Sequence, residues 1–441
     1  MSYSDQIDRL VKHFKSGEKN PSDFTIGIEI EHFLLDKFTM EAILYSGERG
    51  VEKILEDLTR AGWQPVYEQQ HILMLIKNGS SITLEPGAQL ELSTAPRKRL
   101  RQIVDDYFSF LHDVTPVLNS RDINLTAIGY QPVSSISNIP FLPKKRYEHM
   151  QSYLKTKGKL AHNMMKGTAS TQVSIDYSNE QDYIKKNKVV NFLAPIVYCM
   201  FDNAPYYEGI LHEKRSARSI IWDNCDPDRC GAPSGVFTDR FGYEAYAEYI
   251  LNTPSILFKK DNVLVATDNK KIKEIFDPES FSSEELEYLL TMVFPDSRTK
   301  TYIEIRMGDS MPYPFSISYA AFWKGLMYNA KNLNTLFMQA IEFDKRTLDK
   351  IKKDIRANGA LANFGNKTVF DAFKCLLAMA MDGLDDCEKK YLHPIIALSE
   401  SGLTLKDLTL NNETQKVSKA IEWCILNEFA YDGSCSHIAC R

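Results

Sequence analysis

The sequence predicts an α+β fold, with an antiparallel sheet in its first two thirds and helices in its last third. Alternating apolar and polar residues, typical of strands, recur through the first two thirds of the 441-residue chain. Hairpin signals and uneven insertions separate these strands, which favours antiparallel pairing. From about Glu342 onward the pattern is helical, with no convincing strand. No Gly-rich phosphate loop supports a doubly wound nucleotide fold instead.

Each element follows from its local pattern. Alternation with a period of two predicts strands at Asp23–Leu34, Pro65–Glu68, Ile72–Lys77, Ser81–Leu84, Gln89–Ser93, Asn124–Tyr130, Thr171–Tyr177 and Thr301–Arg306. Apolar residues three to four positions apart predict helices at Val51–Ala61, Leu100–Leu118, Gln181–Asp202, Ser283–Met292 and Ser316–Leu333. Asn78-Gly79 predicts a hairpin, because both residues tolerate the positive φ of a tight turn.

The composition is that of a compact, soluble protein. The chain has 53 Lys and Arg against 58 Asp and Glu, a formal charge of −5 and a pI near 6.1. This balance argues against a general nucleic-acid or anionic-membrane partner, because neither counterion release nor lipid attraction would favour binding. No run of 18 or more apolar residues is present to span a bilayer. We therefore expect small-molecule partners only.

The N-terminal segment and the cysteines predict a cytoplasmic location. Residues 1–17 lack the basic start and apolar run of a secretory signal. Eight cysteines scattered through a long chain suit a reducing compartment better than a disulfide framework. The tail brings Cys435, His437 and Cys440 close together. Because no second half of a metal site accompanies them, we expect a frayed terminus there.

Glutamates alternate with aliphatic residues in and beside the predicted strands. In Ile28-Glu29-Ile30-Glu31 the aliphatic side chains face one way and the carboxylates the other. The same arithmetic places a set of polar side chains on one side of their strands: Glu29, Glu31, Glu85, Glu91, Gln172, Glu304 and Arg306. Strand order is not readable from the sequence, so the convergence of these strands is an assumption.

Spacing alone leaves two interpretations of these glutamates open. In the first, the sheet is simply amphipathic and its outer face is solvated. Such faces usually mix charges, whereas Lys is absent here and carboxylates on neighbouring strands repel one another. In the second, cations keep the carboxylates ionised together. All-oxygen ligation selects Mg²⁺ or Mn²⁺, which often bridges a protein to nucleotide phosphates, and Arg306 suits a phosphoryl oxygen. We favour this second interpretation.

A collinear set of motifs resembles the plant-type glutamate–cysteine ligase family. The matching stretches are GIEIEHFLLD, SITLEPGAQLELSTAP, AIGYQP, PKKRYEHMQSYL, STQVSIDY, RSIIWDNCDPDRCG, FGYEAYAEYIL, TYIEIRMGDSMPYPF and AFWKGLMYN. They run from about Phe24 to Asn329, with a looser helical match to about residue 405. The presence of both LEPGxQxELS and YIEIR makes the resemblance specific.

The resemblance implies a fold and a reaction. The family builds a curved antiparallel sheet of the glutamine synthetase and guanido kinase type, whose concave face holds ATP and metal ions. It joins the γ-carboxylate of glutamate to the amine of cysteine through a γ-glutamyl phosphate. The product, γ-glutamylcysteine, is the first intermediate of glutathione synthesis. We expect residues 1–341 to form the catalytic unit and residues 342–441 to form a helical region packed on it.

Carried over residue by residue, the resemblance assigns metal and nucleotide roles. Glu29, Glu31, Glu91 and Glu304 match metal-binding glutamates, Glu85 is an additional ligand or a partner of one, and Gln172 stands where relatives place a polar ligand. Arg306 resembles the arginine that contacts the ATP phosphates. Glu304 and Arg306 are the predicted catalytic residues, with Mg²⁺ as the expected metal and ATP as co-substrate.

The resemblance also assigns the glutamate site. Arg146, Tyr147 and Arg218 match residues that hold the substrate carboxylate, although without the family context a surface salt bridge would be the favoured role of each arginine. Trp222 is predicted to line this pocket, with a core position as the equal alternative. Arg229 is predicted to help bind nucleotide, with a role in fixing its own loop as the alternative.

The departures from the family cluster where the acceptor amine should bind. Ile220 replaces a histidine, Met307–Met311 replaces a Gly-rich stretch, and Lys166-Gly167 replaces an arginine-containing stretch. A γ-glutamyl ligase with another amine acceptor is therefore the alternative function. No covalent enzyme intermediate is needed, so Cys225 and Cys230 are interpreted as small hydrophobic residues. A monomer or a homodimer is expected.

Overall fold

A nine-stranded antiparallel sheet organises the protein, as the sequence predicts. The computed structural model describes residues 2–411 and 416–428, so the cysteine-containing tail lies outside the described residues. The strand order is β14-β15-β7-β1-β5-β4-β3-β2, and β6 pairs with the far end of β1. The strands are β1 (Ile26–Asp36), β2 (Gln64–Glu68), β3 (His71–Lys77), β4 (Ser80–Leu84), β5 (Leu90–Ser93), β6 (Ile123–Thr126), β7 (Ser170–Ile175), β14 (Ser297–Thr299) and β15 (Ile303–Asp309).

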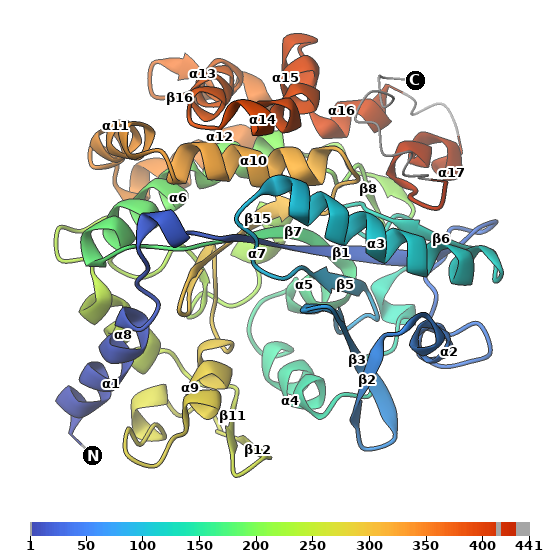
Figure 1. Ribbon diagram of the computed structural model, residues 1–441, viewed down its shortest axis with the longest axis horizontal. Coiled ribbons are helices and arrows are strands. Elements are labelled where there is room, and N and C mark those ends of the chain that lie inside the picture. Colours follow the sequence, from blue (N-terminus) through green and yellow to red (C-terminus); the bar gives the residue numbers. More distant parts are fainter. Residues whose placement is uncertain (1, 412–415, 429–441) are drawn as a thin grey trace.

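Helices cover both faces of this sheet, as Figure 1 shows. On one face lie α3 (Leu100–Asn119), α6 (Glu180–Met200) and α10 (Phe315–Met327), which contact the central strands. On the other side lie α4 (Lys145–Leu154), α5 (Ala161–Gly167) and α7 (Ala217–Asp223). Strand β1 shows the result of this layering, because Ile26, Ile28 and Ile30 are fully buried towards the first helical layer. The glutamates of β1 therefore face the second layer.

The remaining elements of the first two thirds surround this core. Helix α1 (Tyr3–Lys15) packs on α8 (Tyr243–Asn252), α2 (Val51–Leu58) packs on α3, and α9 (Ser283–Leu290) packs on β11 (Leu257–Lys260). Three small sheets pair β11 with β12 (Val263–Ala266), β8 (Tyr206–Tyr207) with β9 (Ile210–Leu211), and β10 (Cys230–Gly231) with β13 (Phe294–Pro295). The predicted hairpin is confirmed, because Asn78 and Gly79 both have positive φ between β3 and β4. No described helix is long and apolar enough to cross a bilayer.

Two sequence predictions about the last part of the chain are wrong. The helix predicted at Ser316–Leu333 is two helices, because α10 ends at Met327 and the Asn329 side chain caps the start of α11 (Ala330–Ala340). The C-terminal region also contains a short hairpin, β16 (Asn363–Phe364) with β17 (Lys367–Thr368), in which Gly365 takes the positive φ of the turn. Strands of two residues are too short to produce a periodic pattern.

Most other described residues of the C-terminal region are helical. The helices are α12 (Lys345–Asn358), α13 (Val369–Asp382), α14 (Asp386–Lys389), α15 (His393–Glu400), α16 (Leu405–Leu410) and α17 (Val417–Ala420). Of these, α12, α13 and α15 pack on α6 or α10, as Figure 1 shows. Helices α10 and α13 approach each other closely at Gly325. A Cβ on Gly325 would lie 2.2 Å from the carbonyl oxygen of Ala380. This glycine therefore sets the distance between the two helices.

We expect Gly325→Ala to lower the free energy of unfolding by about 1–3 kcal/mol, the usual cost of overfilling a packed site. In a free helix the same change would be stabilising, because alanine has the higher helix propensity. Urea denaturation followed by circular dichroism measures the effect. Gly27→Ala is the matched control, since its new Cβ would meet only the Ser174 Cβ, at 3.7 Å. A stable Gly325→Ala protein would show that the two helices separate without cost.

Candidate active site

The register of the sheet brings the predicted glutamates to one place. Glu31 of β1 lies directly opposite Glu91 of β5. Glu29 lies opposite Gln172 of β7 on the other side of β1. Residues directly opposite one another on antiparallel strands have their Cβ atoms about 5 Å apart and point to the same face. One strand beyond β7, Glu304 of β15 completes the row.

Three glutamates of this face are buried, and Glu29 and Glu85 are partly exposed. Glu31 and Glu91 are less than a tenth exposed and Glu304 is fully buried. Burial, together with the neighbouring carboxylates of Glu91 and Glu304, raises the pKa of Glu29 to about 8. Burial with Glu85 and Glu91 likewise raises the pKa of Glu31 to about 8. The interpretation as a simply solvated amphipathic sheet is therefore excluded. Glu29 and Glu31 lack enough nearby positive charge to ionise at the usual pH of a glutamate.

Glu91 and Glu85 extend the same cluster. Burial and the carboxylate of Glu85 raise the pKa of Glu91 to about 7, although the Thr83 hydroxyl donates to it at 2.6 Å. Burial also raises the pKa of Glu85, against the opposing charges of Lys144, Arg146 and Arg306. All five predicted glutamates therefore influence one another's protonation. This convergence, assumed from the sequence, is confirmed.

Glu304 differs from the other glutamates because cations surround it. Its carboxylate forms ion pairs with Arg298 at 2.7 Å, Lys300 at 3.3 Å and Arg306 at 2.7 Å. Although burial alone would raise the pKa of Glu304, these three cations hold it well below its usual range. Arg298 and Lys300 come from β14 and its turn, which the sequence analysis did not recognise as part of the site. Both add positive charge to this end of the glutamate face.

Gln172 links the two halves of the face. Its amide nitrogen donates to Glu31 Oε1 at 3.1 Å, and its amide oxygen accepts a hydrogen bond from Arg306 Nη1. Glu31 also accepts hydrogen bonds from the backbone N–H and the hydroxyl of Ser170, both at 2.7 Å. The anionic half around Glu31 is thereby fixed next to the cationic half around Glu304.

The donor set fits a hard divalent cation by its chemistry. It consists of carboxylate oxygens, and each of Glu29, Glu31 and Glu91 has a raised pKa that a cation would lower. Among the described residues, however, no three Asp, Glu, His or Cys side chains are already grouped as a ligand set. Glu31 and Glu91 are instead hydrogen-bonded to Ser170 and Thr83. Binding an ion therefore requires rotation of these side chains.

Trp222 and the two arginines beside it each have a buried N–H group without a partner among the described residues. The Trp222 ring centre lies 5.4 Å from the Arg218 guanidinium carbon and 5.8 Å from that of Arg306. Arg218 Nη1, Arg306 Nε and Trp222 Nε1 are all buried and make no hydrogen bond within the described part of the chain. Buried donors of this kind are costly unless a ligand satisfies them. We call these three unsatisfied donors the oxyanion site, because an oxyanion is the kind of ligand group that accepts from N–H donors.

Arg146 and Tyr147 border the cluster from α4. The Tyr147 hydroxyl donates to the Leu84 carbonyl at 3.0 Å, which places the helix beside Glu85. Arg146 donates to the side chain and carbonyl of Thr291, at 2.9 and 3.1 Å. Neither Arg146 nor Arg218 takes part in an ion pair among the residues described, so the surface salt bridge considered for each is absent. Both remain available to a substrate carboxylate.

Arg229 lies apart from this cluster and is fully buried. Its guanidinium donates to Asp226, to the Met292 and Pro254 carbonyls and to the Tyr153 hydroxyl. These bonds give every guanidinium nitrogen a partner, which is what the alternative role of fixing the loop requires, and the predicted nucleotide role stays a prediction.

The departures from the family motifs do not all bear on a ligand. Met307 and Met311 belong to the hydrophobic core. Lys166 is also buried, and its ammonium group donates to the Ile139 carbonyl at 2.7 Å. Cys225 is likewise buried. Ile220, in contrast, is partly exposed on α7, one residue before Ile221 and two before Trp222. Ile220 lies between Arg218 and Trp222 in the chain, and Met307 directly follows Arg306 but points into the core.

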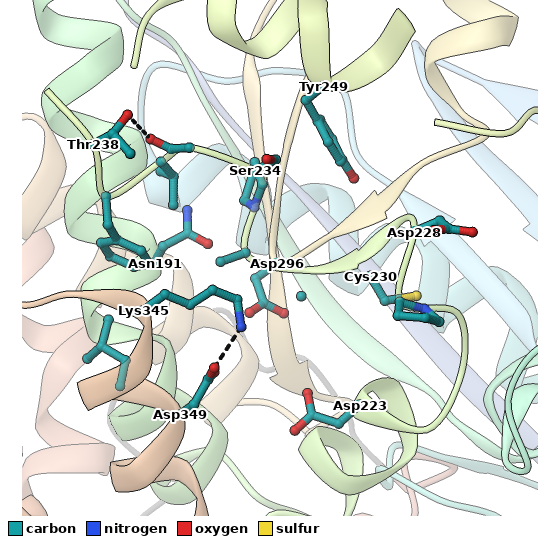
Figure 2. Close-up of a pocket in the computed structure, with 18 of the residues that line it drawn as sticks. Asn191, Asp223, Asp228, Cys230, Ser234, Thr238, Tyr249, Asp296, Lys345 and Asp349 are labelled. Atoms are coloured by element: carbon teal, nitrogen blue, oxygen red, sulfur yellow. Dashed lines mark hydrogen bonds and ion pairs between the residues drawn. The ribbon is translucent and has the colours of Figure 1, made fainter. Parts of the chain in front are cut away.

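A cavity of about 1130 Å³ adjoins the site on the side of Trp222 and Asp296. Figure 2 shows Asp296 at its centre, Cys230 and Asp228 from the loop on one side, and Lys345 and Asp349 of α12 on the other. Asp296 directly precedes β14, and its carbonyl accepts the backbone N–H of Arg306 in β15 at 3.0 Å. Helix α12 reaches across the cavity through the Lys352–Asp296 ion pair, at 3.4 Å. The C-terminal region therefore contacts Asp296, whose carbonyl binds the backbone N–H of Arg306.

Sequence comparison matches this architecture to one family. The profile of glutamate-cysteine ligase family 2 matches residues 25–418, which include every residue of the site described above. The chain belongs to glutamate-cysteine ligase family 2. It is 30% identical over 423 residues to a chloroplastic glutamate–cysteine ligase A of Oryza sativa subsp. indica, covering 94% of this chain and 86% of the relative. It is also 30% identical over 406 residues to the chloroplastic glutamate–cysteine ligase of Arabidopsis thaliana, covering 90% and 77%.

A solved structure supports the fold of this family member. A glutamate–cysteine ligase of Francisella tularensis in complex with AMP superimposes with a TM-score of 0.56. The alignment covers 91% of this chain and 87% of the other, at 12% identity. At that identity the likeness concerns the fold alone. It agrees with a mixed α+β architecture around one large antiparallel sheet.

The raised pKa values of the glutamates predict how pH and metal affect stability. Glu29 and Glu31 titrate near pH 8 in the folded protein and near 4.5 when unfolded. Because the folded state binds their protons more tightly, the stability that they contribute is complete below about pH 4.5 and is lost as the pH rises to about 8. In EDTA, we expect Tm to fall between about pH 6 and pH 8, and to fall less in Glu31→Gln.

Mg²⁺ should reverse this loss, because a metal binds the deprotonated carboxylates. We expect it to raise Tm more at about pH 8 than at about pH 6, measured by differential scanning fluorimetry. An equal effect at both values would place the metal away from these glutamates.

Proposed function

We propose that the protein is an ATP- and Mg²⁺-dependent glutamate–cysteine ligase that forms γ-glutamylcysteine through a γ-glutamyl phosphate. Its membership of glutamate-cysteine ligase family 2 supports the reaction. The single observation that carries the proposed mechanism is the division of one sheet face into an anionic half and a cationic half. Glu29, Glu31 and Glu91 occupy the first, and Arg298, Lys300 and Arg306 gather around Glu304 in the second.

The cationic half suits the transfer of a phosphoryl group from ATP to the γ-carboxylate of glutamate. Glu304 holds three cations in fixed positions before any substrate arrives, so little reorganisation is needed as charge develops on the transferring oxygens. Arg306 offers the free N–H of its Nε towards these oxygens. In this proposal Glu304 binds the three phosphate-binding cations through ion pairs. This role adds to, or replaces, its predicted role as a metal ligand.

The donors around Trp222 suit the substrate side of the same reaction. Arg218 Nη1 and Trp222 Nε1 would satisfy a glutamate carboxylate or the acyl phosphate oxygens, as a bidentate guanidinium and an indole N–H do elsewhere. Arg146, next to Glu85, would hold the other end of the glutamate molecule. A bound Mg²⁺ would lower the repulsion between the ATP phosphates and the incoming carboxylate. Glu29, Glu31 and Glu91, with Glu85 and Gln172 beside them, are the proposed ligands of that ion.

Further features remain proposals of the same kind. We propose that the sheet is of the glutamine synthetase type, which its antiparallel pairing and its polar face support. We also propose that residues 1–341 and 342–441 act as one unit, and that the enzyme works as a cytoplasmic monomer or homodimer. The described cysteines are free thiols, in agreement with a reducing compartment.

The reaction is tested by ADP release from the purified protein with Mg²⁺ and glutamate. We expect cysteine to stimulate ADP release strongly and the product to have the mass of γ-glutamylcysteine. EDTA should abolish turnover. Stimulation by another amine, but not by cysteine, would keep the glutamate site and replace the acceptor. No stimulation by any amine would contradict the proposed function.

The oxyanion site is tested by Trp222→Phe. This change keeps an aromatic ring beside Arg218 and Arg306 but removes the free N–H, so we expect kcat to fall by about 10²-fold, as for the loss of one oxyanion donor. Trp323→Phe is the matched control, because it removes an indole N–H from the core of α10, away from the site. Equal kcat values for the two variants would remove Trp222 Nε1 from the reaction.

A further inference from the structure

Helix α7 carries Arg218 and Trp222, and the C-terminal region holds this helix at both of its ends. Arg218 is almost fully buried, yet its one hydrogen bond within the described residues runs from Nε to the Arg306 carbonyl, at 3.1 Å. It takes part in no ion pair with a described residue. The direction of its guanidinium therefore depends on where α7 itself is placed.

The start of α7 has an unusual backbone conformation. Ser216, the residue before the helix, has φ of 58° and ψ of 51°, which is the left-handed region that side chains other than glycine rarely adopt. Such a conformation persists only where surrounding contacts impose it. Asp202 supplies one of these contacts, because its Oδ2 accepts the Ser216 N–H at 2.7 Å.

Helix α16 of the C-terminal region supplies the other contacts at this end. The Lys406 ammonium donates to the Lys214 carbonyl at 2.7 Å and lies 3.6 Å from Asp202 Oδ2. Both Lys406 and Asp202 are fully buried, so this pair is shielded from salt and water. Next to it, Arg215 forms an ion pair with Asp407 at 2.8 Å. Residues about 190 positions later in the chain thus fix the segment that leads into α7.

Helix α12 holds the other end of α7. Arg356 Nη2 donates to the Ser219 hydroxyl at 2.8 Å and to the Ser219 carbonyl at 3.3 Å. The same guanidinium pairs with Asp223, the last residue of α7. Ser219 and Asp223 directly follow Arg218 and Trp222 in the chain. A displacement of Arg356 would therefore move the two oxyanion donors that α7 carries, Arg218 and Trp222.

We propose that Lys406 and Arg356 are positioning residues for glutamate binding, which act by holding α7 so that Arg218 faces the substrate carboxylate. The inference rests on the proposed function. It makes the helical C-terminal region a part of the glutamate site, although neither residue contacts the substrate. The cationic half of the sheet face is built from β14 and β15, so ATP binding does not depend on these contacts to α7 in the same way.

The test compares Arg356→Ala and Lys406→Met in the full chain. We expect each variant to raise the KM for glutamate about tenfold, the size expected when charge-assisted hydrogen bonds no longer orient a binding group. The KM for ATP should change by less than about twofold. Lys324→Ala is the matched control. It removes an ion pair, Lys324–Glu388 at 2.6 Å, that also joins the C-terminal region to the body of the protein, but at α10.

Rescue separates positioning from general destabilisation. Asp223→Arg combined with Arg356→Asp restores an ion pair of opposite polarity, and we expect it to recover part of the lost glutamate affinity. Arg356→Lys should give an intermediate KM. Circular dichroism establishes that each variant is folded. Equal changes in both KM values, a normal glutamate KM in Arg356→Ala and Lys406→Met, or the same effect in Lys324→Ala would overturn the inference.

Calorimetry of glutamate binding, in the presence of Mg²⁺ and a non-hydrolysable ATP analogue, distinguishes this inference from the proposed function. A wild-type protein that binds glutamate without forming γ-glutamylcysteine would overturn the proposed reaction, and the variants would still test the role of α7 through affinity. A wild-type protein that does not bind glutamate would overturn both.

Discussion

The repulsion between carboxylates on one buried face of the sheet is the constraint on which the site depends. Register places Glu31 opposite Glu91, with Glu29 on the same strand as Glu31 and Glu304 two strands away. The protein compensates these charges unequally. Glu304 has three cationic partners, whereas no ion pair of the described residues includes Glu29, Glu31 or Glu91. The unequal compensation produces adjacent regions of opposite sign. A nucleotide with its metal ion carries charges complementary to these regions, with the cation matching the carboxylates and the phosphates matching the cationic side chains.

The helices on the second side of the sheet complete this arrangement by excluding water. Helix α4 is tied to β4 through Tyr147, and α7 is tied to β15 through Arg218. Exclusion of water strengthens each electrostatic interaction and makes an unpaired N–H costly. The free donors at Arg218, Trp222 and Arg306 are therefore the atoms at which a bound ligand would stabilise the fold. Fold stability and substrate affinity are linked at these atoms.

Local pattern was sufficient to predict the central part of the fold and of the site. The alternation in β1 predicts both the buried isoleucines and the glutamates on the opposite face, because a strand has a fixed period of two. The same rule applies to Glu91 and Glu304. The convergence of the strands required family resemblance, since register between strands far apart in sequence has no local signal.

Other functional residues had no signal in the sequence that a pattern could detect. Arg298 and Lys300 belong to a strand of three residues and its turn, too short to show a period. Lys406 and Arg356 act on α7 from positions more than 130 residues away. Arg229, in contrast, had a motif match but forms its hydrogen bonds within its own loop and the neighbouring segments. Only the folded structure separates these roles.

The position of β1 in the sheet has a consequence for the order of assembly during synthesis. This strand is made before the other strands of the sheet, and its neighbour β7 lies about 145 residues later and β15 a further 130. Strands β2 to β5 can pair with one another as they emerge, and β5 can pair with one edge of β1. The part of the other edge of β1 that pairs with β7 stays unpaired until β7 has been made. Folding of this kind, dominated by distant contacts, is slow. Glu29 and Glu31 give β1 negative charge while this edge is open, and charge on an open edge strand opposes aggregation of the nascent chain.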